Sequence, residues 1–532
     1  MSTTSCDAVV VGAGPNGLVA ANALADAGWD VVLVEAAPEV GGAVRSAEVT
    51  APGFVTDLYS AFYPLAAASP VIRDLDLARH GLVWRRAPDV MAHALPDGRA
   101  AVLRGDATAT AAGLETCSAG DGDAWLRMVG DWQRVRDPLL DALFTPFPAA
   151  GPVLRLLRRT GVSGGLDLAR LALLSVRRLG EEEFGSEEAR VLLTGNAMHS
   201  DVSPDGAGSA LFGWLLVMLG QDVGFPVPEG GAGRLAAALR ARAEGLGAAV
   251  RCGVAATAVE VTAGRASGVR LADGSRVTAR RAVLADVAAP TLYRGLVGPR
   301  HLPARLLDEL LRFEWDDATL KVNWALDAPI PWTAPAVATA GTVHLGSDDD
   351  GLVDVAADLT VGRMPEHPFV LLGQMTTSDP TRSPAGTESA WAYTHLPRHL
   401  AQDADAVDAQ AERVEREVER VAPGFLALRR GRHVQRPASL EAADANLDRG
   451  AVNAGTSALH QQLVFRPTKG LGRPETPLPG LFLAGASAHP GGGVHGACGW
   501  NAAVAALGQH GGLGFVRRAL VRTAWSRVLR EP

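Results

Sequence analysis

Apolar residues in the first fifty positions form two short continuous runs separated by a longer alanine-rich segment. The first run ends at Val9–Val11 and the second spans Val31–Val34, with a glycine-rich stretch directly after the first run. Short apolar runs bounded by turn residues are typical of buried parallel strands, and the segment between them is long enough for a helix. The pattern predicts a strand–helix–strand unit at the N-terminus.

The turn that leaves the first strand has the sequence Gly12-Ala13-Gly14-Pro15-Asn16-Gly17. Gly12 permits the tight turn, Gly14 lets backbone approach a pyrophosphate, and Gly17 lets the helix pack tightly on the strand. The helix N-terminus offers unpaired N–H groups and a positive dipole end to phosphates. Glu35, which ends the second strand, can accept hydrogen bonds from the ribose hydroxyls of an adenosine. Together these residues predict a dinucleotide site.

A glycine doublet bears on which dinucleotide is bound. Gly41-Gly42 follows Glu35 after five intervening residues and precedes Arg45. Two successive glycines allow backbone to run alongside a second stretch of pyrophosphate and the ribityl chain. The arrangement resembles the FAD-binding branch that contains amine oxidases and carotenoid desaturases. Members of that branch often have arginine directly after the doublet, where this chain has Ala43, so a phosphate-binding arginine is expected at Arg45 or elsewhere.

The C-terminal region carries a second glycine-rich motif, GLFLAGASAHPGGGVHGACGWNAAV, at residues 480–504. It predicts a short buried strand, a turn at Gly485-Ala486, a backbone-exposing loop at Gly491–Gly493 and an apolar helix from Val494 onward. The motif is similar to the C-terminal flavin signature of phytoene-desaturase-like and carotene-ketolase-like oxidoreductases, and residues 461–467 fit the same pattern. Many relatives carry an acid where this chain has Ala486, and its replacement occurs in the desaturase-like branch.

Both ends of the chain therefore resemble FAD-dependent phytoene desaturase-like oxidoreductases of the flavin amine oxidase superfamily. The resemblance implies an α/β fold with a Rossmann-like FAD-binding domain of the glutathione-reductase type and an inserted α+β substrate domain. We expect a discontinuous FAD-binding domain formed by residues 1–110, 226–290 and 450–532. The substrate domain is expected to comprise residues 111–225 and 291–449.

The resemblance also implies that FAD is held without a covalent bond, because no tethering motif is recognisable. In the family pattern the adenine meets backbone near Ala256, and the pyrimidine edge of the flavin meets the C-terminal glycine loop. The residues expected to bind FAD are Gly12, Gly14, Pro15, Asn16, Gly17, Glu35, Ala36, Gly41, Gly42, Arg45, Ala256, Gly485, Ala486, Gly492, Gly493 and Val494.

Lys321 is the main candidate for a catalytic side chain. It lies in the apolar run Thr319–Trp324, where a lysine is costly unless its ammonium finds partners. A flavin N5 takes a hydride from a C–H bond, while the protein orients the substrate and excludes water. In flavin amine oxidases a lysine in a similar strand is linked through water to flavin N5, and Lys321 resembles it. The alternative is an edge-strand lysine that reaches solvent.

His495, beside the C-terminal glycine loop, is the second catalytic candidate. An imidazole near its ordinary pKa could relay protons at neutral pH, and a purely structural histidine is the alternative. His489 and Cys498 lie close in sequence, but no fourth ligand accompanies them, so no metal site is expected.

Composition narrows the partners and the location. With a net charge of −8, the chain is not expected to bind nucleic acid, and its four scattered cysteines include no CxxC pair. No signal peptide is recognisable and the apolar stretch at residues 210–219 is too short to span a bilayer, so a cytoplasmic protein is expected. The basic, leucine-rich segment 153–178 and the C-terminal segment either face solvent or contact the inner membrane face. The C-terminal segment could equally dock on a second copy of the chain.

Three functions stay open at this point. The first is a dehydrogenase or desaturase that introduces a double bond into an apolar, secondary-metabolite-type substrate by hydride transfer to flavin N5, with oxygen or a quinone as electron acceptor. The second is an amine or amino-acid oxidase producing an imine and hydrogen peroxide, for which no aromatic cage or carboxylate-binding arginine is visible. The third is a redox-neutral isomerase or a non-catalytic flavoprotein. The desaturase is favoured because the glycine-loop motif most resembles that branch.

Overall fold

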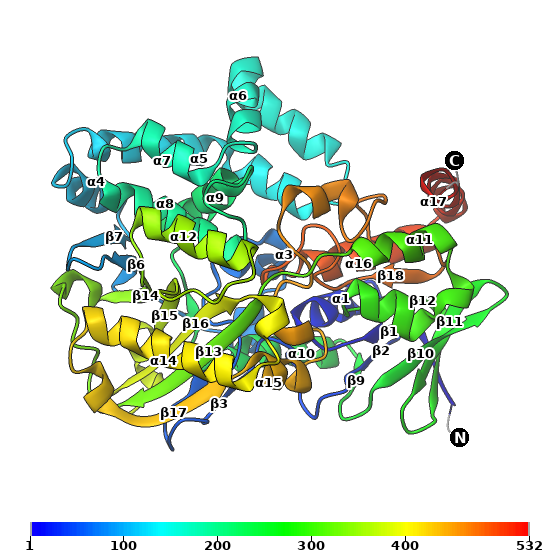
Figure 1. The fold of residues 1–532 in the computed structure, drawn as a ribbon. Coiled ribbons are helices and arrows are strands. Elements are labelled where there is room, and N and C mark those ends of the chain that lie inside the picture. The colour runs from blue at the N-terminus through cyan, green and yellow to red at the C-terminus, as the bar shows by residue number, and fades with distance from the viewer. Residues whose placement is uncertain (1–2, 530–532) are drawn as a thin grey trace.

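The computed structural model describes residues 3–529, and two large sheets form its framework. In Figure 1 the sheet that contains the N-terminal strand lies on the right and the second sheet lies on the left. Helices of residues 107–223 form a layer above the second sheet in the same view. The expected α/β architecture is confirmed.

The first sheet is built around the predicted strand–helix–strand unit. Its strand order is β10-β11-β12-β1-β2-β9, and β18 pairs with the end of β12. The strands β9, β2, β1, β12 and β18 run parallel, whereas β10, β11 and the start of β12 form an antiparallel meander. Their bounds are β1 (Thr3–Val11), β2 (Val31–Val34), β9 (Ala249–Arg251), β10 (Ala256–Thr262), β11 (Arg265–Leu271), β12 (Arg276–Ala285) and β18 (Leu481–Leu483).

Three helices pack on one face of this sheet, namely α1 (Pro15–Asp26), α10 (Gly233–Gly245) and α16 (Ala497–His510). A Cβ on Gly17 would lie 2.0 Å from the carbonyl oxygen of Gly12, so only glycine allows α1 to begin this close to β1. A Cβ on Gly499 would lie 1.8 Å from the carbonyl oxygen of Asn16. The C-terminal helix is therefore pressed against the first turn of α1, and the two glycine-rich motifs meet in space.

The second sheet has the order β17-β13-β16-β15-β14-β6-β7. One face carries an apolar core covered by α14 (Ala404–Val421), and the other face points toward the helical layer. The central strands are buried along their whole length. Their bounds are β6 (Asp89–Ala94), β7 (Ala100–Arg104), β13 (Ala318–Leu326), β14 (Ala340–Leu345), β15 (Val370–Gln374), β16 (Glu388–Leu396) and β17 (Arg429–Gln435).

The helical layer is the predicted helical segment between the first two parts of the FAD-binding domain. It contains α4 (Ala107–Glu115), α5 (Asp121–Phe144), α6 (Ala150–Leu171), α7 (Val176–Glu183), α8 (Glu187–Ala197), η2 (Met198–Ser200) and α9 (Ser209–Val223). Within residues 3–529, no helix combines the length and the apolar composition that crossing a bilayer requires. The helices α12 (Asp349–Thr360) and α17 (Gly514–Val528) complete the longer elements.

Short elements connect these layers. They are β3 (Ser46–Ala47), β4 (Thr56–Asp57), β5 (Trp84–Arg85), β8 (Val227–Pro228), α2 (Pro64–Ala68), α3 (Pro70–Asp74), η3 (Thr291–Val297), α11 (Ala304–Glu309), α13 (Met375–Ser378), η7 (Pro380–Arg382), α15 (Pro437–Ala443), η11 (Leu459–Gln461) and η12 (Leu463–Phe465).

The division between the two sheets differs from the expected segment boundaries at two places. Strands β6 and β7 lie within 1–110, yet β6 pairs with β14 of the second sheet, because its alternating residues complete that sheet's buried faces. Conversely, η3 and α11 lie within 291–449, but their apolar residues pack in a core of the first sheet. The second sheet thus begins near residue 89, and the first sheet's packing extends past residue 300.

Candidate functional site

The glycine turn after β1 lies directly against Asp286, the residue that follows β12. A Cβ on Gly14 would lie 2.8 Å from Asp286 Oδ2, and the Gly17 N–H donates to the same oxygen at 2.8 Å. Burial raises the pKa of Asp286 to about 7. The sequence reasoning missed this residue, although an acid that directly follows an apolar strand is a signal that could have found it.

Glu35 is bound to backbone at the end of β2. Its Oε2 accepts from Ala13 N–H at 2.6 Å and its Oε1 from Ala37 N–H at 2.8 Å, so Ala36 lies within the turn that the carboxylate closes. The N–H of Val254 donates to the Glu35 carbonyl at 3.0 Å. The segment leading into β10, where Ala256 begins the strand, therefore lies beside the end of β2, as the adenosine site requires.

The glycine doublet closes over the first glycine turn. A Cβ on Gly42 would lie 3.1 Å from the Cα of Gly14, and the Gly41 N–H donates to the Ala13 carbonyl at 2.8 Å. Arg45 follows, with Nε donating to the Gly42 carbonyl at 2.9 Å and Nη2 to the Tyr59 hydroxyl at 2.8 Å. Arg45 thus lies at the doublet with protein partners of its own.

The C-terminal motif reaches the same edge of the first sheet. A Cβ on Gly485 would lie 2.8 Å from the carbonyl oxygen of Val287, the neighbour of Asp286. Ala486 and the loop beyond it are held by the buried Arg466, whose Nη2 donates to the Ala486 carbonyl at 2.8 Å. Arg466 belongs to the upstream part of the motif, but only the structure assigns it this positioning role.

The glycine loop that follows lies between two neighbouring segments. A Cβ on Gly492 would lie 2.5 Å from Asn453 Oδ1, and one on Gly493 would lie 2.8 Å from Leu65 Cδ1. Val494 packs against the core of the first sheet. The backbone of this loop is therefore fixed tightly on both sides before α16 begins.

These residues fit a dinucleotide on structural grounds. Backbone from the first turn, the doublet and the C-terminal motif converges where a side chain on Gly14, Gly42 or Gly485 would collide. The Oδ1 atom of Asn16, at the N-terminus of α1, is buried and has no hydrogen-bond partner among the described residues. An unpaired polar atom beside unpaired helix N–H groups matches the hydrogen-bonding capacity of a pyrophosphate.

His495 lies beside this region, but its environment differs from the expectation. Its Nδ1 accepts from the Ala497 N–H at 3.0 Å, and its ring lies 5.3 Å from the ring of Phe144. Burial lowers the pKa of His495 to about 4. The premise of a proton relay with an ordinary pKa is therefore wrong, because the ring is a neutral acceptor at the start of α16.

Lys321 is fully enclosed in the interior of the second sheet. Strand β13 pairs with β16 on one side and β17 on the other, so the alternative of an edge-strand lysine is wrong. The Lys321 Nζ donates to the carbonyls of Asp57 at 2.5 Å and Tyr59 at 2.8 Å, and lies 4.6 Å from the centre of the Trp391 ring. Because desolvation outweighs the attraction of Asp57, the pKa of Lys321 falls to about 7.

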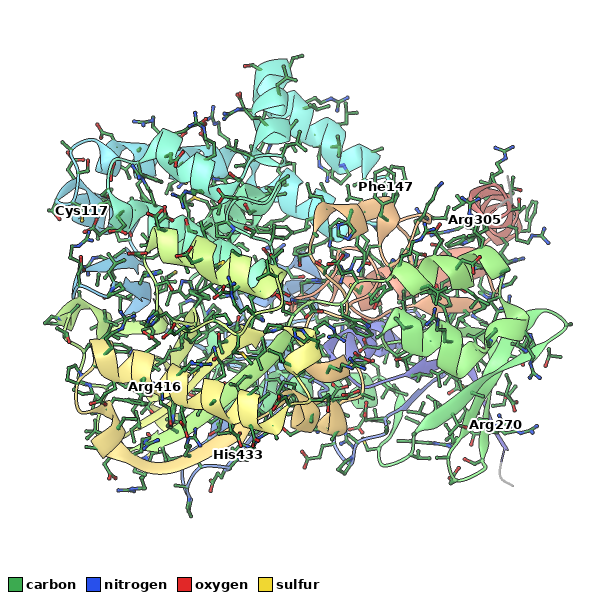
Figure 2. All side chains as sticks on the ribbon, in the orientation of Figure 1. Cys117, Phe147, Arg270, Arg305, Arg416 and His433 are labelled. Atoms are coloured by element: carbon green, nitrogen blue, oxygen red, sulfur yellow. The ribbon has the colours of Figure 1, made fainter. Side chains whose placement is uncertain are left out.

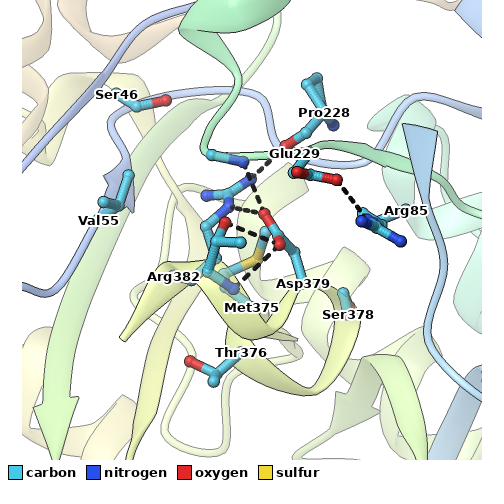
Figure 3. A network of polar contacts seen from close by, with 12 residues as sticks. Ser46, Val55, Arg85, Pro228, Glu229, Met375, Thr376, Ser378, Asp379 and Arg382 are labelled. Carbon is cyan, nitrogen blue, oxygen red and sulfur yellow. Dashed lines mark hydrogen bonds and ion pairs between the residues drawn. The ribbon is translucent and has the colours of Figure 1, made fainter. Parts of the chain in front are cut away.

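A buried ionic network joins the Lys321 region to both sheets (Figure 3). Arg382, whose side chain is 0% exposed, pairs with Asp57 Oδ1 at 3.0 Å and Asp379 Oδ2 at 2.9 Å. Its Nη2 also donates to the Pro228 carbonyl at 3.2 Å. Asp57 thus holds Arg382 through its side chain and Lys321 through its main chain. Tyr59 likewise connects Lys321 to Arg45 at the doublet, whereas no contact among the described residues joins Lys321 to His495.

The four cysteines are free thiols. Cys6 and Cys498 are buried, and Cys117 lies exposed at the outer end of the helical layer (Figure 2). Within residues 3–529 no three histidine, cysteine or acidic side chains are grouped closely enough to hold a metal ion.

Comparison with known protein families decides the assignment. The family model described as flavin containing amine oxidoreductase matches residues 16–507, which spans both glycine-rich motifs and both sheets. The chain belongs to this family. It is a flavin-dependent oxidoreductase with FAD as its cofactor, as the two motifs predicted.

Several curated proteins are similar to this family member over nearly their whole length. The rat pyridine nucleotide-disulfide oxidoreductase domain-containing protein 2 is 30% identical, with 93% of this chain and 92% of the rat protein covered. A limonene dehydrogenase polypeptide of Castellaniella defragrans is 24% identical, with 94% of each chain covered. The zeta-carotene-forming phytoene desaturase of Myxococcus xanthus is 27% identical, with 93% of this chain and 92% of that enzyme covered.

Solved structures share the fold. Wild-type putrescine oxidase bound to putrescine aligns with a TM-score of 0.61 at 18% identity, covering 94% of this chain and 99% of that one. The predicted Rossmann-like fold of a flavin oxidoreductase is thereby confirmed, as is the resemblance to desaturase-like members of the family.

Proposed function

We propose that this flavin oxidoreductase is a dehydrogenase or desaturase that introduces a double bond into a small, largely apolar, secondary-metabolite-type molecule. The observation that carries the proposal is the C-terminal glycine loop of the desaturase-like branch, packed against the N-terminal glycine turn of the FAD site. Two relatives named for limonene dehydrogenation and phytoene desaturation support the same reaction class.

The proposed roles of the chain's residues follow from the contacts above. Glu35 and the segment at Ala256 hold the adenosine, the glycine turn and doublet hold the pyrophosphate, and the loop at 491–493 meets the flavin ring. FAD, held without a covalent bond, supplies a hydride acceptor at N5. Lys321 presents a positive charge at the floor of the site when it is protonated, with Asp57 and Tyr59 fixing its position.

An amine oxidase is the second candidate, because one structural neighbour is putrescine oxidase and because two aromatic rings line the same sheet face. The rings of Trp391 and Tyr393 are nearly parallel, with an interplanar angle of 8° and centres 6.0 Å apart. A substrate ammonium would bind at such faces through cation–π attraction. However, Lys321 Nζ already lies over Trp391, and a second cation there would be repelled whenever Lys321 is protonated. The dehydrogenase is therefore favoured.

The proposal extends to partners and location. We place the enzyme in the cytoplasm, because its four free thiols suit a reducing compartment. Oxygen or a quinone is the proposed electron acceptor. An apolar substrate would be collected at a membrane surface, and the exposed apolar side chains of α6 and α17 are the proposed contact with its inner face.

Cofactor release and anaerobic reduction test the proposal. Denaturation of the purified yellow protein should release FAD into the supernatant, and flavin retained by the precipitate would contradict the non-covalent assignment. Anaerobic mixing with a metabolite panel should bleach the flavin with one class of compound, whose product should have lost two hydrogens by mass spectrometry. Release of ammonia and an aldehyde would instead support the amine oxidase, and unchanged flavin with an isomerised product would support redox-neutral chemistry.

A further inference from the structure

The sheet face that carries Lys321 has a second polar group of residues farther along the strands. In the β13–β16 ladder Lys321 is opposite Tyr393, and Thr319 is opposite His395. Because alternate residues of a strand share a face, Tyr393 and His395 lie on the same face as Lys321. The proposed function uses Lys321 but leaves this second group without a role.

Asp201 approaches His395 from the helical layer. It follows η2 in a left-handed conformation with φ 58°, and its Oδ1 lies 3.3 Å from His395 Nε2. The two side chains are only 4% and 7% exposed. Among the described residues, neither carboxyl oxygen of Asp201 and neither ring nitrogen of His395 has a hydrogen-bond partner of normal geometry. Buried polar atoms in this state require a partner that protein groups do not supply.

The surrounding residues leave accessible space at this point. Tyr393 and His199 keep partial exposure, although both rings lie among buried neighbours. The Tyr393 ring meets the His395 ring edge-on with centres 5.4 Å apart. Asp316, two residues before the buried β13 core, accepts N–H groups of Val452 and Asn453 and so ties this corner to the segment that supports the glycine loop.

The unpaired groups are kept in their neutral forms. Desolvation, reinforced by Asp316, raises the pKa of Asp201 well above its ordinary value, while desolvation lowers the pKa of His395. Burial also lowers the pKa of His199 to about 3. A protonated carboxyl donates a hydrogen bond and a neutral imidazole can donate or accept one. Such a pair suits a neutral oxygen atom rather than an ammonium or a carboxylate.

We propose that Asp201 and His395 form a subsite that binds a hydroxyl or carbonyl group of the substrate, beside the position of Lys321. This proposal rests on the proposed function and makes it more specific: the substrate is an oxygenated, otherwise apolar molecule rather than a plain hydrocarbon. A site built to hydrogen-bond a substrate oxygen discriminates strongly against the analogue that lacks it, because its own polar groups are then left unpaired.

The test compares substrates that differ by one hydroxyl. The FAD-loaded enzyme is titrated anaerobically with limonene and perillyl alcohol, and with neurosporene and hydroxyneurosporene. Perturbation of the bound-flavin spectrum reports binding and its bleaching reports reduction. We expect the hydroxylated member of at least one pair to bind at least about tenfold more tightly. His395→Phe should abolish this preference while leaving hydrocarbon binding equal or tighter.

Two further variants separate the subsite from general damage. Asp201→Asn keeps a neutral donor and should retain the preference, whereas Asp201→Ala should lose it. Thr394→Val, which changes the neighbouring residue on the opposite sheet face, should leave it intact. FAD content of each variant confirms folding.

The outcomes distinguish this inference from the proposed function. Equal binding of both members of each pair, or a preference that survives His395→Phe, would overturn the subsite, while flavin bleaching by the hydrocarbons would leave the dehydrogenase assignment standing. Failure of every panel compound to perturb or bleach the flavin would also overturn the subsite. The dehydrogenase assignment would then be judged by the wider metabolite panel.

Discussion

Lys321 is bonded to two carbonyl oxygens in the interior of a sheet, which gives its charge an unusual pH range. The carbonyls of Asp57 and Tyr59 accept from Nζ, but they do not neutralise the ammonium. With a pKa of about 7, the side chain is charged below neutrality and loses its charge above it. A lysine of this kind can respond to a change in charge on a nearby group within the physiological pH range.

Lys321→Met tests that role. The substitution keeps length and apolarity, so we expect folding and FAD content to survive while turnover or flavin reoxidation falls by about ten- to a thousandfold, as for loss of one electrostatic contact. In the wild type the affected rate should fall as the pH rises through about 7, because the charge is lost, and in the variant it should not change across that range. Stopped-flow measurement of both half-reactions identifies the step. Wild-type rates in the variant would remove Lys321 from the catalytic residues.

Asp286 makes a second pH-dependent prediction at the opposite end of the cofactor site. Its carboxyl has a pKa of about 7 because of burial, with Asp444 and Glu35 adding like charge. A bound pyrophosphate would favour the protonated form further, so FAD affinity should fall by up to about tenfold per pH unit above that pKa. Asp286→Asn keeps an acceptor for Gly17 N–H and should flatten this dependence.

Reconstitution of apoprotein, followed by flavin fluorescence, gives the dissociation constant at each pH. Asp273→Asn is the matched control, because Asp273 lies exposed in the turn between β11 and β12. It should show the same pH dependence as the wild type. If Asp286→Asn and the wild type lose FAD affinity in parallel, the carboxyl does not face the pyrophosphate.

At the level of elements, local patterns predicted the first sheet well. The strand–helix–strand unit, the hairpin at 273–274, the helix α10 and the short strand β18 all carry their signals within a few residues of sequence. Glycines 17 and 485 lie where the motif required close packing. These features depend on neighbours in sequence, so hydrophobic period and turn chemistry suffice to place them.

The second sheet and its site depended on contacts that no local pattern contains. The partners of Lys321 lie more than 260 positions earlier in the chain, and β6 joins β14 across a similar distance. The acid at Asp286 and the pair Asp201–His395 become meaningful only when separate segments meet. Tertiary context therefore decided both the segment boundary near residue 89 and the pKa of His495.

The network around Arg382 gives a prediction about how the elements are held together. Arg382→Met should destabilise the FAD-loaded protein by about 3–5 kcal/mol, because it leaves Asp57 and Asp379 buried without their cation. The exposed pair of Arg85 and Glu229 in the same view is the control (Figure 3).

Arg85→Met should cost at most about 1 kcal/mol, as is usual for surface ion pairs. Urea unfolding monitored by tryptophan fluorescence measures both variants. Adding Asp57→Asn to Arg382→Met should recover part of the loss, because it removes an uncompensated charge. Equal effects of the two arginine substitutions would show that the buried network does not hold the sheets together.

At the scale of the whole molecule, exposed apolar residues gather on two projecting helices. α6 has no buried residue, and its Leu154 and Leu166 are 48% and 66% exposed. On α17, Phe515 and Leu520 are 67% and 66% exposed. In Figure 1 both helices lie on the upper side of the molecule, with the segment of η11 and η12 between them.

Contacts connect these parts into one face. Phe147, which precedes α6 and is labelled in Figure 2, donates its N–H to the Gly472 carbonyl at 3.1 Å. Trp525 of α17 donates to the carbonyl of Glu475 at 3.2 Å. Arginines accompany the apolar side chains on both helices, although the whole chain has a net charge of −8. Such a local combination fits an anionic lipid surface rather than a polyanion in solution.

We therefore expect the protein to sediment with vesicles that contain phosphatidylglycerol and to stay in solution with phosphatidylcholine vesicles. Each exposed leucine or phenylalanine that enters the lipid boundary contributes about 1.5–3 kcal/mol, so replacing Leu154, Leu166, Phe515 and Leu520 by serine should abolish vesicle binding. FAD content should be unchanged, because these side chains are far from burial in any core. Leu246→Ser, at an exposed site after α10, should bind vesicles like the wild type. Added salt should weaken binding by screening the arginines, while the apolar contribution persists. If the fourfold variant instead loses self-association and the wild type ignores both kinds of vesicle, the face is a contact between copies of the chain, and a membrane-collected substrate has no support.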